Sequence, residues 1–285
     1  MTFATAILAL VVGTWNGDWF PSGRAEHRAS PEKEEETIAL AAKMLASGLK
    51  AVDPEGTDEV ILCLNEMRSP LVVSNLVSRL GRDGLKTAVV SGYRRRDRFD
   101  QQQDAIATTL PVAARGWSVF LRAKKRDETP PRGYAFAAVV SDGGAVTTRV
   151  YAVHLKSEYG ATTEEKRRLN RVKRGAAIEQ IVKMESPPKR RKNVVPSRVV
   201  IAGDMNADRW SEYFSQDTFF GVLDEAGFLD VFSGMGREER DTHPSKRWGP
   251  STLDYVFPRG LGAPQKVHIE PTNGASDHNA VFVRF

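Results

Sequence analysis

Short polar clusters that adjoin apolar runs recur along this chain, and they constrain its fold more than any other feature. The best defined is Val199-Val200-Ile201-Ala202-Gly203-Asp204-Met205-Asn206, in which an apolar, β-branched run leads to a carboxylate and a carboxamide. Such a run predicts a buried strand. If strand geometry persists, Asp204 and Asn206 share one face at the strand's end. The alternative is a plain strand-to-turn exit, since Gly, Asp and Asn are common in turns.

The same pattern occurs at further places along the chain. The other polar residues that adjoin predicted strands are Asn16 with Asp18, Glu66, His154, and Asp277 with His278. Asp254 adds a further carboxylate within Leu253-Asp254-Tyr255. Catalytic residues gather where strand ends of one scaffold converge, so we expect these side chains to form one site.

The composition is that of an ordinary globular protein. The 285 residues are 41% hydrophobic and 27% charged, which allows a full core without disulfides. The single cysteine, Cys63, excludes an internal disulfide and a cysteine-based metal cluster. The formal net charge is +5, which is compatible with a polyanionic partner.

Periodicity and capping residues predict four helices and a larger number of strands. Ser30 suits the N-cap of a helix that ends near Gly48, and the others cover about 70–80, 163–184 and 219–226. Strands are expected at 7–15, 60–64, 87–90, 105–108, 117–122, 134–140, 146–153, 199–203, 253–257, 267–269 and 280–285. Residues 233–251 are expected to form a long loop. Two similar halves that mix hairpins and helices predict two sheets packed face to face with helices outside.

The residue types indicate the chemistry. Carboxylates and carboxamides without thiols suit a hard cation such as Mg²⁺ or Mn²⁺. Two histidines in the same clusters can donate hydrogen bonds and transfer protons near neutral pH. This combination suits the attack of water on a phosphate ester. The sequence contains neither a serine or cysteine nucleophile motif nor a Walker-type loop.

The ordered motifs resemble those of the endonuclease/exonuclease/phosphatase superfamily. They are Thr14-Trp15-Asn16, Leu64-Asn65-Glu66, His154-Leu155-Lys156-Ser157, Gly203-Asp204-Met205-Asn206, Leu253-Asp254-Tyr255 and Ser276-Asp277-His278. The resemblance implies a Mg²⁺-dependent phosphoesterase, with Mn²⁺ as an alternative cation. It also implies an α/β (α+β) fold, a four-layer α/β/β/α sandwich of two mixed, mainly antiparallel sheets. Residues 1–285 are expected to form a single catalytic domain.

The same resemblance implies a role for each motif residue. Glu66 is the principal metal ligand, and the residues expected to assist it are Asn16, Asp18 and Asp277. Asp204 aligns the attacking water and Asn206 binds the scissile phosphate. His278 binds the phosphate with its orientation fixed by Asp254, and His154 faces the phosphate or the leaving group. The structural alternatives are a strand-end histidine at residue 154 and a strand cap at residue 254. Three histidines belong to no motif and are expected to be structural: His27, His243 and His268.

The substrate is less constrained. The segment Tyr93–Gln103 is rich in arginine, and Arg clusters bind phosphate backbones. The candidate substrate contacts are Arg94, Arg95, Arg96 and Arg98, and the alternative is a solvated loop. We expect a nuclease or phosphodiesterase acting on DNA or RNA. The alternatives are an enzyme for small-molecule or lipid-linked phosphate esters and an inactive binding module of the same fold.

The N-terminal residues raise the question of export. Residues 1–12 are mostly apolar, which leaves a signal peptide as an alternative, but it is poorly supported because no Lys or Arg precedes them. No run approaches the roughly 18 apolar residues that a membrane span requires. We therefore expect a soluble protein, with the cytoplasm favoured and export left open.

Overall fold

The computed structural model describes residues 9–23, 29–95, 98–99, 102–141, 144, 146–186, 198–245 and 249–285. Its helices are α1 (Pro31–Val52), α2 (Pro70–Ser78), α3 (Glu164–Met184) and α4 (Phe219–Glu225). The strands are β1 (Leu10–Phe20), β2 (Glu59–Met67), β3 (Lys86–Val90), β4 (Arg94–Arg95), β5 (Arg98–Phe99), β6 (Gln103–Thr108), β7 (Val112–Val119), β8 (Gly133–Ser141), β9 (Val146–His154), β10 (Arg198–Asp204), β11 (His243–Ser245), β12 (Gly249–Ser251), β13 (Asp254–Arg259), β14 (Lys266–Glu270) and β15 (Ala280–Arg284).

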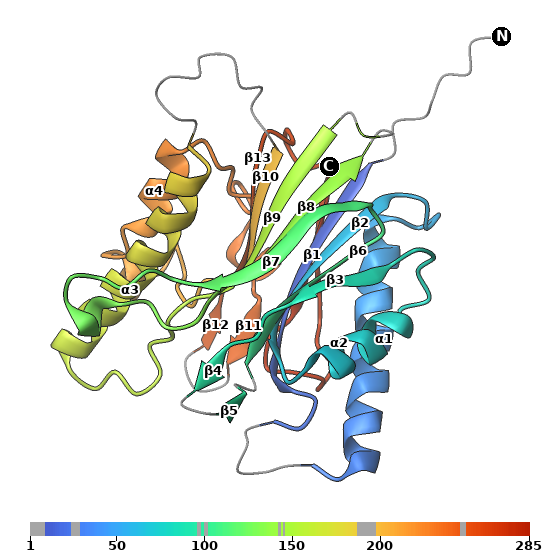
Figure 1. The fold of residues 1–285 in the computed structure, drawn as a ribbon, viewed down its shortest axis with the longest axis horizontal. Helices are drawn as coiled ribbons and strands as arrows, with labels where there is room; N and C mark the ends of the chain where they lie inside the picture. Colours follow the sequence, from blue (N-terminus) through green and yellow to red (C-terminus); the bar gives the residue numbers. More distant parts are fainter. Residues whose placement is uncertain are drawn as a thin grey trace.

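Two sheets form the centre of the molecule (Figure 1). One has the strand order β14-β15-β1-β2-β6-β3, and the other has the order β13-β10-β9-β8-β7. The β1–β2 and β9–β10 pairs are parallel, and the other pairs within these two sheets are antiparallel. Helices α1 and α2 lie outside the first sheet and α3 and α4 outside the second. The predicted four-layer sandwich is therefore confirmed.

The first sheet alternates its side chains between two cores, as a sheet covered on both faces must. Val12 and Ile61 belong to the core between the sheets, whereas Val11 and Leu62 pack with the residues of α1 and α2. Both faces are apolar, so the strands appear in the sequence as nearly continuous hydrophobic runs. This explains why most of their limits were predictable to within about three residues, although β1 extends to Phe20, five residues beyond its predicted end.

Helix boundaries follow the expected caps at three of the four N-termini. The side chains of Ser30, Ser69 and Thr163 each accept a hydrogen bond from the backbone three residues later. The expected end of the first helix at Gly48 is wrong, because α1 continues to Val52. Gly48 serves close packing instead, since a Cβ atom there would lie 2.1 Å from Cε2 of Phe282.

Two other expectations need correction. Residues 233–251 contain a small antiparallel hairpin of β11 and β12 within the expected loop. Strand β7 begins at Val112, five residues before the predicted start, and ends at Val119. It is an edge strand with mostly exposed side chains, so it lacks the hydrophobic pattern by which buried strands are recognised.

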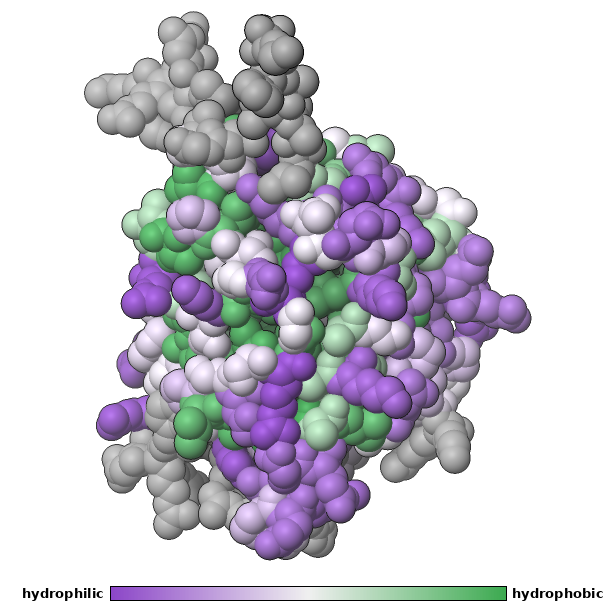
Figure 2. All heavy atoms as spheres, turned by 90° about the vertical axis from the view of Figure 1, so that its right-hand side faces the viewer, coloured by the Kyte–Doolittle hydropathy of each residue, from purple (hydrophilic) through white to green (hydrophobic). Residues whose placement is uncertain are grey.

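The outer face that carries α1 and α2 shows hydrophilic and hydrophobic residues interspersed (Figure 2). Among the helices in the described part of the chain, none combines the length and the apolar character that crossing a membrane requires.

Candidate active site

Three of the expected site residues lie side by side across neighbouring strands. Asp204, at the end of β10, is in register with His154 of β9 on one side and with Asp254 of β13 on the other. Directly opposite residues in a sheet point to the same face, with Cβ atoms about 5 Å apart. The strand pairing alone therefore gathers two carboxylates and an imidazole at one edge of the second sheet.

The backbone at the end of β10 is tightly constrained. Gly203 has φ 141°, and a Cβ atom there would lie 1.9 Å from the carbonyl oxygen of Val153 and 2.8 Å from Oδ1 of Asn65. The same Asn65 oxygen accepts a hydrogen bond from the backbone N–H of Asp204 at 3.1 Å. Asn65 of the first sheet thus fixes the backbone of Asp204 on the second sheet, and only glycine fits between them at residue 203.

Glu66 provides the matching carboxylate from the first sheet. It has φ 60°, an uncommon conformation for a residue other than glycine, and its oxygens accept hydrogen bonds from Trp19 N at 3.1 Å and Gln102 Nε2 at 2.6 Å. The Asn16 amide nitrogen lies 3.4 Å from Glu66 Oε1 and 2.9 Å from Asp204 Oδ2. Asn16 therefore connects the carboxylates contributed by the two sheets.

His154 faces both carboxylates. Its Nε2 lies 3.5 Å from Glu66 Oε1 and 3.6 Å from Asp204 Oδ2, and its side chain is only 3% exposed. Burial lowers the pKa of His154 well below its ordinary value, and the nearby charges of Arg132 and His278 lower it further. The imidazole is therefore neutral at physiological pH.

His278 has the opposite electrostatic character. Its Nδ1 lies 2.7 Å from Asp254 Oδ2. Burial by itself would lower the pKa of His278, but the charges of Asp254 and Asp204 outweigh it and raise the pKa to about 10. Burial raises the pKa of Asp204 to about 7, against the opposing charge of His278. The site thus pairs a protonated imidazole with a carboxylate that ionises near neutrality.

The remaining motif residues occupy more peripheral positions. The Asn206 amide nitrogen donates to Leu155 O at 3.2 Å and to Asp204 Oδ2 at 2.9 Å, so in this structure it orients Asp204. The backbone N–H of Asp18 donates to Asn16 Oδ1 at 3.0 Å and thereby fixes the Asn16 amide. The Asp277 side chain is 57% exposed and lies 3.7 Å from Nε2 of His278.

Sequence patterns missed three residues that lie at this site. His243 was expected to be structural, yet its Nε2 lies 3.7 Å from Asp277 Oδ2 and its ring centroid lies 4.7 Å from that of His278. Gln102 belongs to the arginine-rich segment but contacts Glu66, and Arg132 donates to Gln102 Oε1 at 2.6 Å. A run of three glutamines, which ends at Gln103, was visible in the sequence before the strand predicted at 105–108. No pattern distinguished Arg132 or His243.

The arginine-rich segment begins beside the site. Tyr93 donates its hydroxyl to Asp104 at 3.0 Å, and Asp104 accepts from Asn65, the residue before Glu66, at 2.7 Å. The neighbouring Arg94 has an exposed side chain and lines a surface pocket of about 440 Å³ with Trp117. Arg96 lies outside the described residues, and the side chains of Arg95 and Arg98 are likewise not described.

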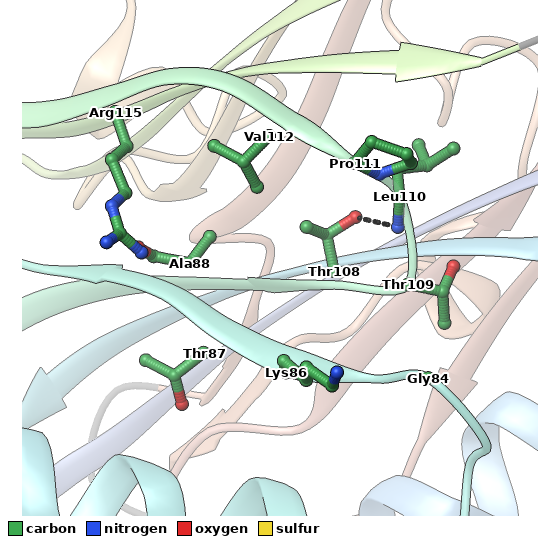
Figure 3. Close-up of a pocket in the computed structure, with 10 residues that line it drawn as sticks. All are labelled: Gly84, Lys86, Thr87, Ala88, Thr108, Thr109, Leu110, Pro111, Val112 and Arg115. Atoms are coloured by element: carbon green, nitrogen blue, oxygen red, sulfur yellow. Dashed lines mark hydrogen bonds between the residues drawn. The ribbon is translucent and has the colours of Figure 1, made fainter. Parts of the chain in front are cut away.

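A second pocket, of about 370 Å³, lies between β3 and the β6–β7 connection (Figure 3). It is lined at the far end of β6 by Thr108, Thr109 and Leu110, whereas the start of β6 at Gln103 adjoins the site. None of its lining residues belongs to the predicted site, so we assign it no function.

The donor set fits a hard divalent cation. No lysine or arginine whose side chain the structure describes lies within ion-pair distance of the Glu66 or Asp204 carboxylates, and their neighbour His154 is neutral. Two buried polar atoms of the expected site residues, His154 Nδ1 and Asp254 Oδ1, find no hydrogen-bond partner in the part of the chain that the structure describes. Carboxylate and amide oxygens are the ligands that Mg²⁺ and Mn²⁺ prefer.

Comparison with known proteins identifies the family. The sequence pattern of the Endonuclease/Exonuclease/phosphatase family matches residues 13–278, nearly the whole chain. The chain belongs to this family, whose members are metal-dependent phosphoester hydrolases. No curated protein sequence matches the chain significantly.

Solved structures show the same fold at low sequence identity. An endonuclease/exonuclease/phosphatase family protein from Leptotrichia buccalis C-1013-b superposes with a TM-score of 0.63 at 14% identity, over 96% of this chain and 98% of that one. Humanized D. rerio TDP2 gives 0.59 at 16% identity, over 97% and 98%. Sphingomyelinase C from Streptomyces griseocarneus gives 0.58 at 14% identity, over 97% and 99%. At these identities the similarity establishes the fold alone.

Proposed function

We propose that this protein is a Mg²⁺-dependent nuclease or phosphodiesterase that hydrolyses phosphodiester bonds of nucleic acids. The observation that carries the proposal is the convergence of Glu66, Asp204 and neutral His154 from two sheets, beside the protonated His278–Asp254 pair. A similar structure in the comparison is D. rerio TDP2 complexed with a single-strand DNA product, which supports the nucleic-acid hypothesis by fold alone.

Glu66 and Asn16 would hold the cation, with Asp18 and Asp277 assisting. The Asn16 amide nitrogen donates to the carboxylates of both Glu66 and Asp204, so Asn16 would hold these two groups beside the cation. The cation, when bound, neutralises charge that develops on the phosphoryl oxygens.

The protein side chains supply the remaining chemistry. Asp204, ionised above its raised pKa of about 7, accepts a proton from the attacking water and orients it. Asn206 keeps the Asp204 carboxylate in place and would bind the scissile phosphate. His278 donates from Nε2 to a phosphoryl oxygen, and Asp254 holds its Nδ1. His154 faces the leaving-group side as a neutral hydrogen-bonding group.

Hydrolysis assays test this proposal directly. Supercoiled plasmid, single-stranded DNA, RNA, the diester bis(4-nitrophenyl) phosphate and the monoester 4-nitrophenyl phosphate would be incubated with Mg²⁺, with Mn²⁺ and with EDTA. We expect cleavage of a nucleic acid that depends on the metal and stops with EDTA. Metal-dependent turnover of phosphate monoesters alone, with every nucleic acid intact, would refute the nuclease assignment.

A second candidate is hydrolysis of lipid-linked phosphate esters. Strand β7 and the residues after it expose large apolar side chains, with Trp117 46%, Val119 56% and Leu121 74% exposed. Exposed apolar groups of this kind can contact a lipid surface. Incubation with phosphocholine-lipid vesicles in the same assay distinguishes this candidate, since a lipid esterase releases phosphocholine and a nuclease does not.

A further inference from the structure

Two cations lie beside His154 without a carboxylate partner. Arg132 and Lys156 are both partly buried, and neither forms an ion pair with any residue that the structure describes. This distinguishes them from Arg174 close by, which is fully buried but paired with Asp217 and Glu158. Partly buried charges are expected to be paired, so an unpaired couple indicates a place for an anion from outside the chain.

Arg132 is held firmly at the edge of the site. Its Nη1 donates to the carbonyl oxygen of His154 at 3.3 Å and its Nη2 donates to Gln102 Oε1 at 2.6 Å. Gln102 in turn donates to Glu66 at 2.6 Å, so only one side chain separates the guanidinium from the proposed metal ligand. Arg132 also has φ 60°, a strained conformation for a residue other than glycine and one that clusters at functional sites.

Lys156 follows His154 by two residues, and hydrogen bonds hold both its backbone and its side chain. Its carbonyl oxygen accepts a hydrogen bond from buried Arg174 at 2.8 Å, and its ammonium donates to Ser157 O at 2.6 Å. Burial lowers the pKa of Lys156, and the positive charge of Arg132 lowers it further. Arg132 contacts the carbonyl of His154 and Lys156 lies two residues further along the same strand exit, so one bound anion could interact with both charges.

We propose that Arg132 and Lys156 form a second anion subsite, which takes a phosphate group neighbouring the scissile phosphate. This inference rests on the proposed function and specifies its substrate, a strand with successive phosphates. A phosphocholine head group does not fit, because it would bring a quaternary ammonium toward two cations. The subsite therefore favours nucleic acid over zwitterionic lipid.

Product-like nucleotides test the subsite without requiring turnover. Binding of thymidine 5′-monophosphate and thymidine 3′,5′-bisphosphate would be measured by calorimetry with Mn²⁺ present, in the wild type and in Lys156→Met, Arg132→Gln and Lys166→Met. Lys166→Met is the control, because Lys166 is exposed on α3 and its replacement removes the same single positive charge as Lys156→Met. We expect the wild type and Lys166→Met to bind the bisphosphate about tenfold more tightly than the monophosphate, as one charged phosphate contact supplies. Lys156→Met and Arg132→Gln should reduce that preference to less than about threefold.

Two results would overturn the subsite: equal affinity of the wild type for both nucleotides, or an undiminished preference in Lys156→Met. Arg132→Gln also touches the Gln102–Glu66 contact, so Mn²⁺ affinity measured by electron paramagnetic resonance would accompany it. If the Mn²⁺ affinity of Arg132→Gln falls, the nucleotide binding of Lys156→Met alone tests the subsite.

Failure of the proposed function is distinguishable. If the protein cleaves no nucleic acid but still binds the bisphosphate more tightly than the monophosphate, the anion subsite is supported and the nuclease assignment is refuted. Conversely, if the protein cleaves DNA but binds both nucleotides equally well, only the proposed anion subsite is refuted. In a cleaving enzyme, Lys156→Met should also reduce the slope of log affinity for single-stranded DNA against log salt concentration by about 0.7.

Discussion

Asn16 and Asp204 are joined by a hydrogen bond of 2.9 Å between strands of different sheets, 188 residues apart in sequence. This contact connects the proposed metal-binding part of the site, around Glu66, with the part around Asp204 that is proposed to orient the water and bind the phosphate. The proposed chemistry accordingly depends on the relative position of two sheets whose strands share no backbone pairing.

Replacing Asp204 by Asn removes the proposed proton acceptor while keeping its size. We expect kcat to fall by about 10²–10⁴. The melting temperature should stay near that of the wild type, because the substitution removes a buried carboxylate. Steady-state kinetics and circular dichroism check both parts. The exposed variant Asp224→Asn is the control, and kcat within threefold of wild type in Asp204→Asn would contradict the assignment.

Activity should depend on pH in a bell shape. Asp204 must lose its proton, so the rate rises through an acid limb near or below pH 7, since a bound cation favours the carboxylate. His278 must keep its proton, so the rate falls near pH 10. Asp254→Asn removes the charge that raises the His278 pKa and should move the alkaline limb to lower pH. An unmoved limb in that variant would exclude His278 as its origin.

The same raised pKa gives a stability prediction. The folded-state pKa of His278, about 10, exceeds its value in an unfolded chain, about 6.5. Its contribution to the free energy of unfolding is therefore complete below pH 6.5 and is lost as pH rises toward 10. Urea unfolding of wild type and His278→Ala across this range should show a stability difference that shrinks with pH. A difference that grows would contradict this assignment.

Metal binding should stabilise the folded chain, because the Glu66 carboxylate forms no ion pair with a lysine or arginine side chain that the structure describes. We expect Mg²⁺ or Mn²⁺ to raise the wild-type melting temperature in thermal-shift assays. Glu66→Gln should lose this increase. Gln102→Leu removes a hydrogen bond to Glu66 and should weaken metal binding by about 10–100-fold, with kcat at saturating metal largely kept. Unchanged metal affinity in both variants would place the cation elsewhere.

Gly203→Ala should be severely destabilising. The new methyl group would lie 1.9 Å from the carbonyl oxygen of Val153, on a backbone with φ 141°. We expect insoluble protein or a loss of several kcal/mol in the free energy of unfolding. Gly221→Ala is the matched control, because it lies in α4 with nothing within 4 Å of the added atom. That variant should be unchanged or up to about 1 kcal/mol more stable.

The sequence was informative where burial imposes a pattern. Strands such as β2 and β10 are covered on both faces, so their apolar runs marked both the strand and the polar residues at its end. The edge strand β7 has no such pattern, and its limits were predicted incorrectly. Gly48 appeared to end a helix because local preference ignores Phe282, which only the folded chain brings near.

Within the site, residues in recognisable motifs could be found and residues that act by position could not. His243 lies beside His278 because the β11–β12 hairpin folds against the segment before β15. Arg132 directly precedes β8 of the second sheet and donates a hydrogen bond to Gln102, which directly precedes β6 of the first sheet. The two residues are 30 positions apart in the sequence. Neither arrangement leaves a local signal in the sequence, since both depend on tertiary packing.

The pairing of β1 with β15 has a consequence for biosynthesis. Asn16 lies on the first strand and His278 immediately precedes the last, and Ser276 donates its hydroxyl to the backbone of Asn16. The proposed catalytic centre cannot assemble until residue 278 has been translated and β15 has closed against β1. A growing chain that still lacks β15 would therefore lack the complete proposed site.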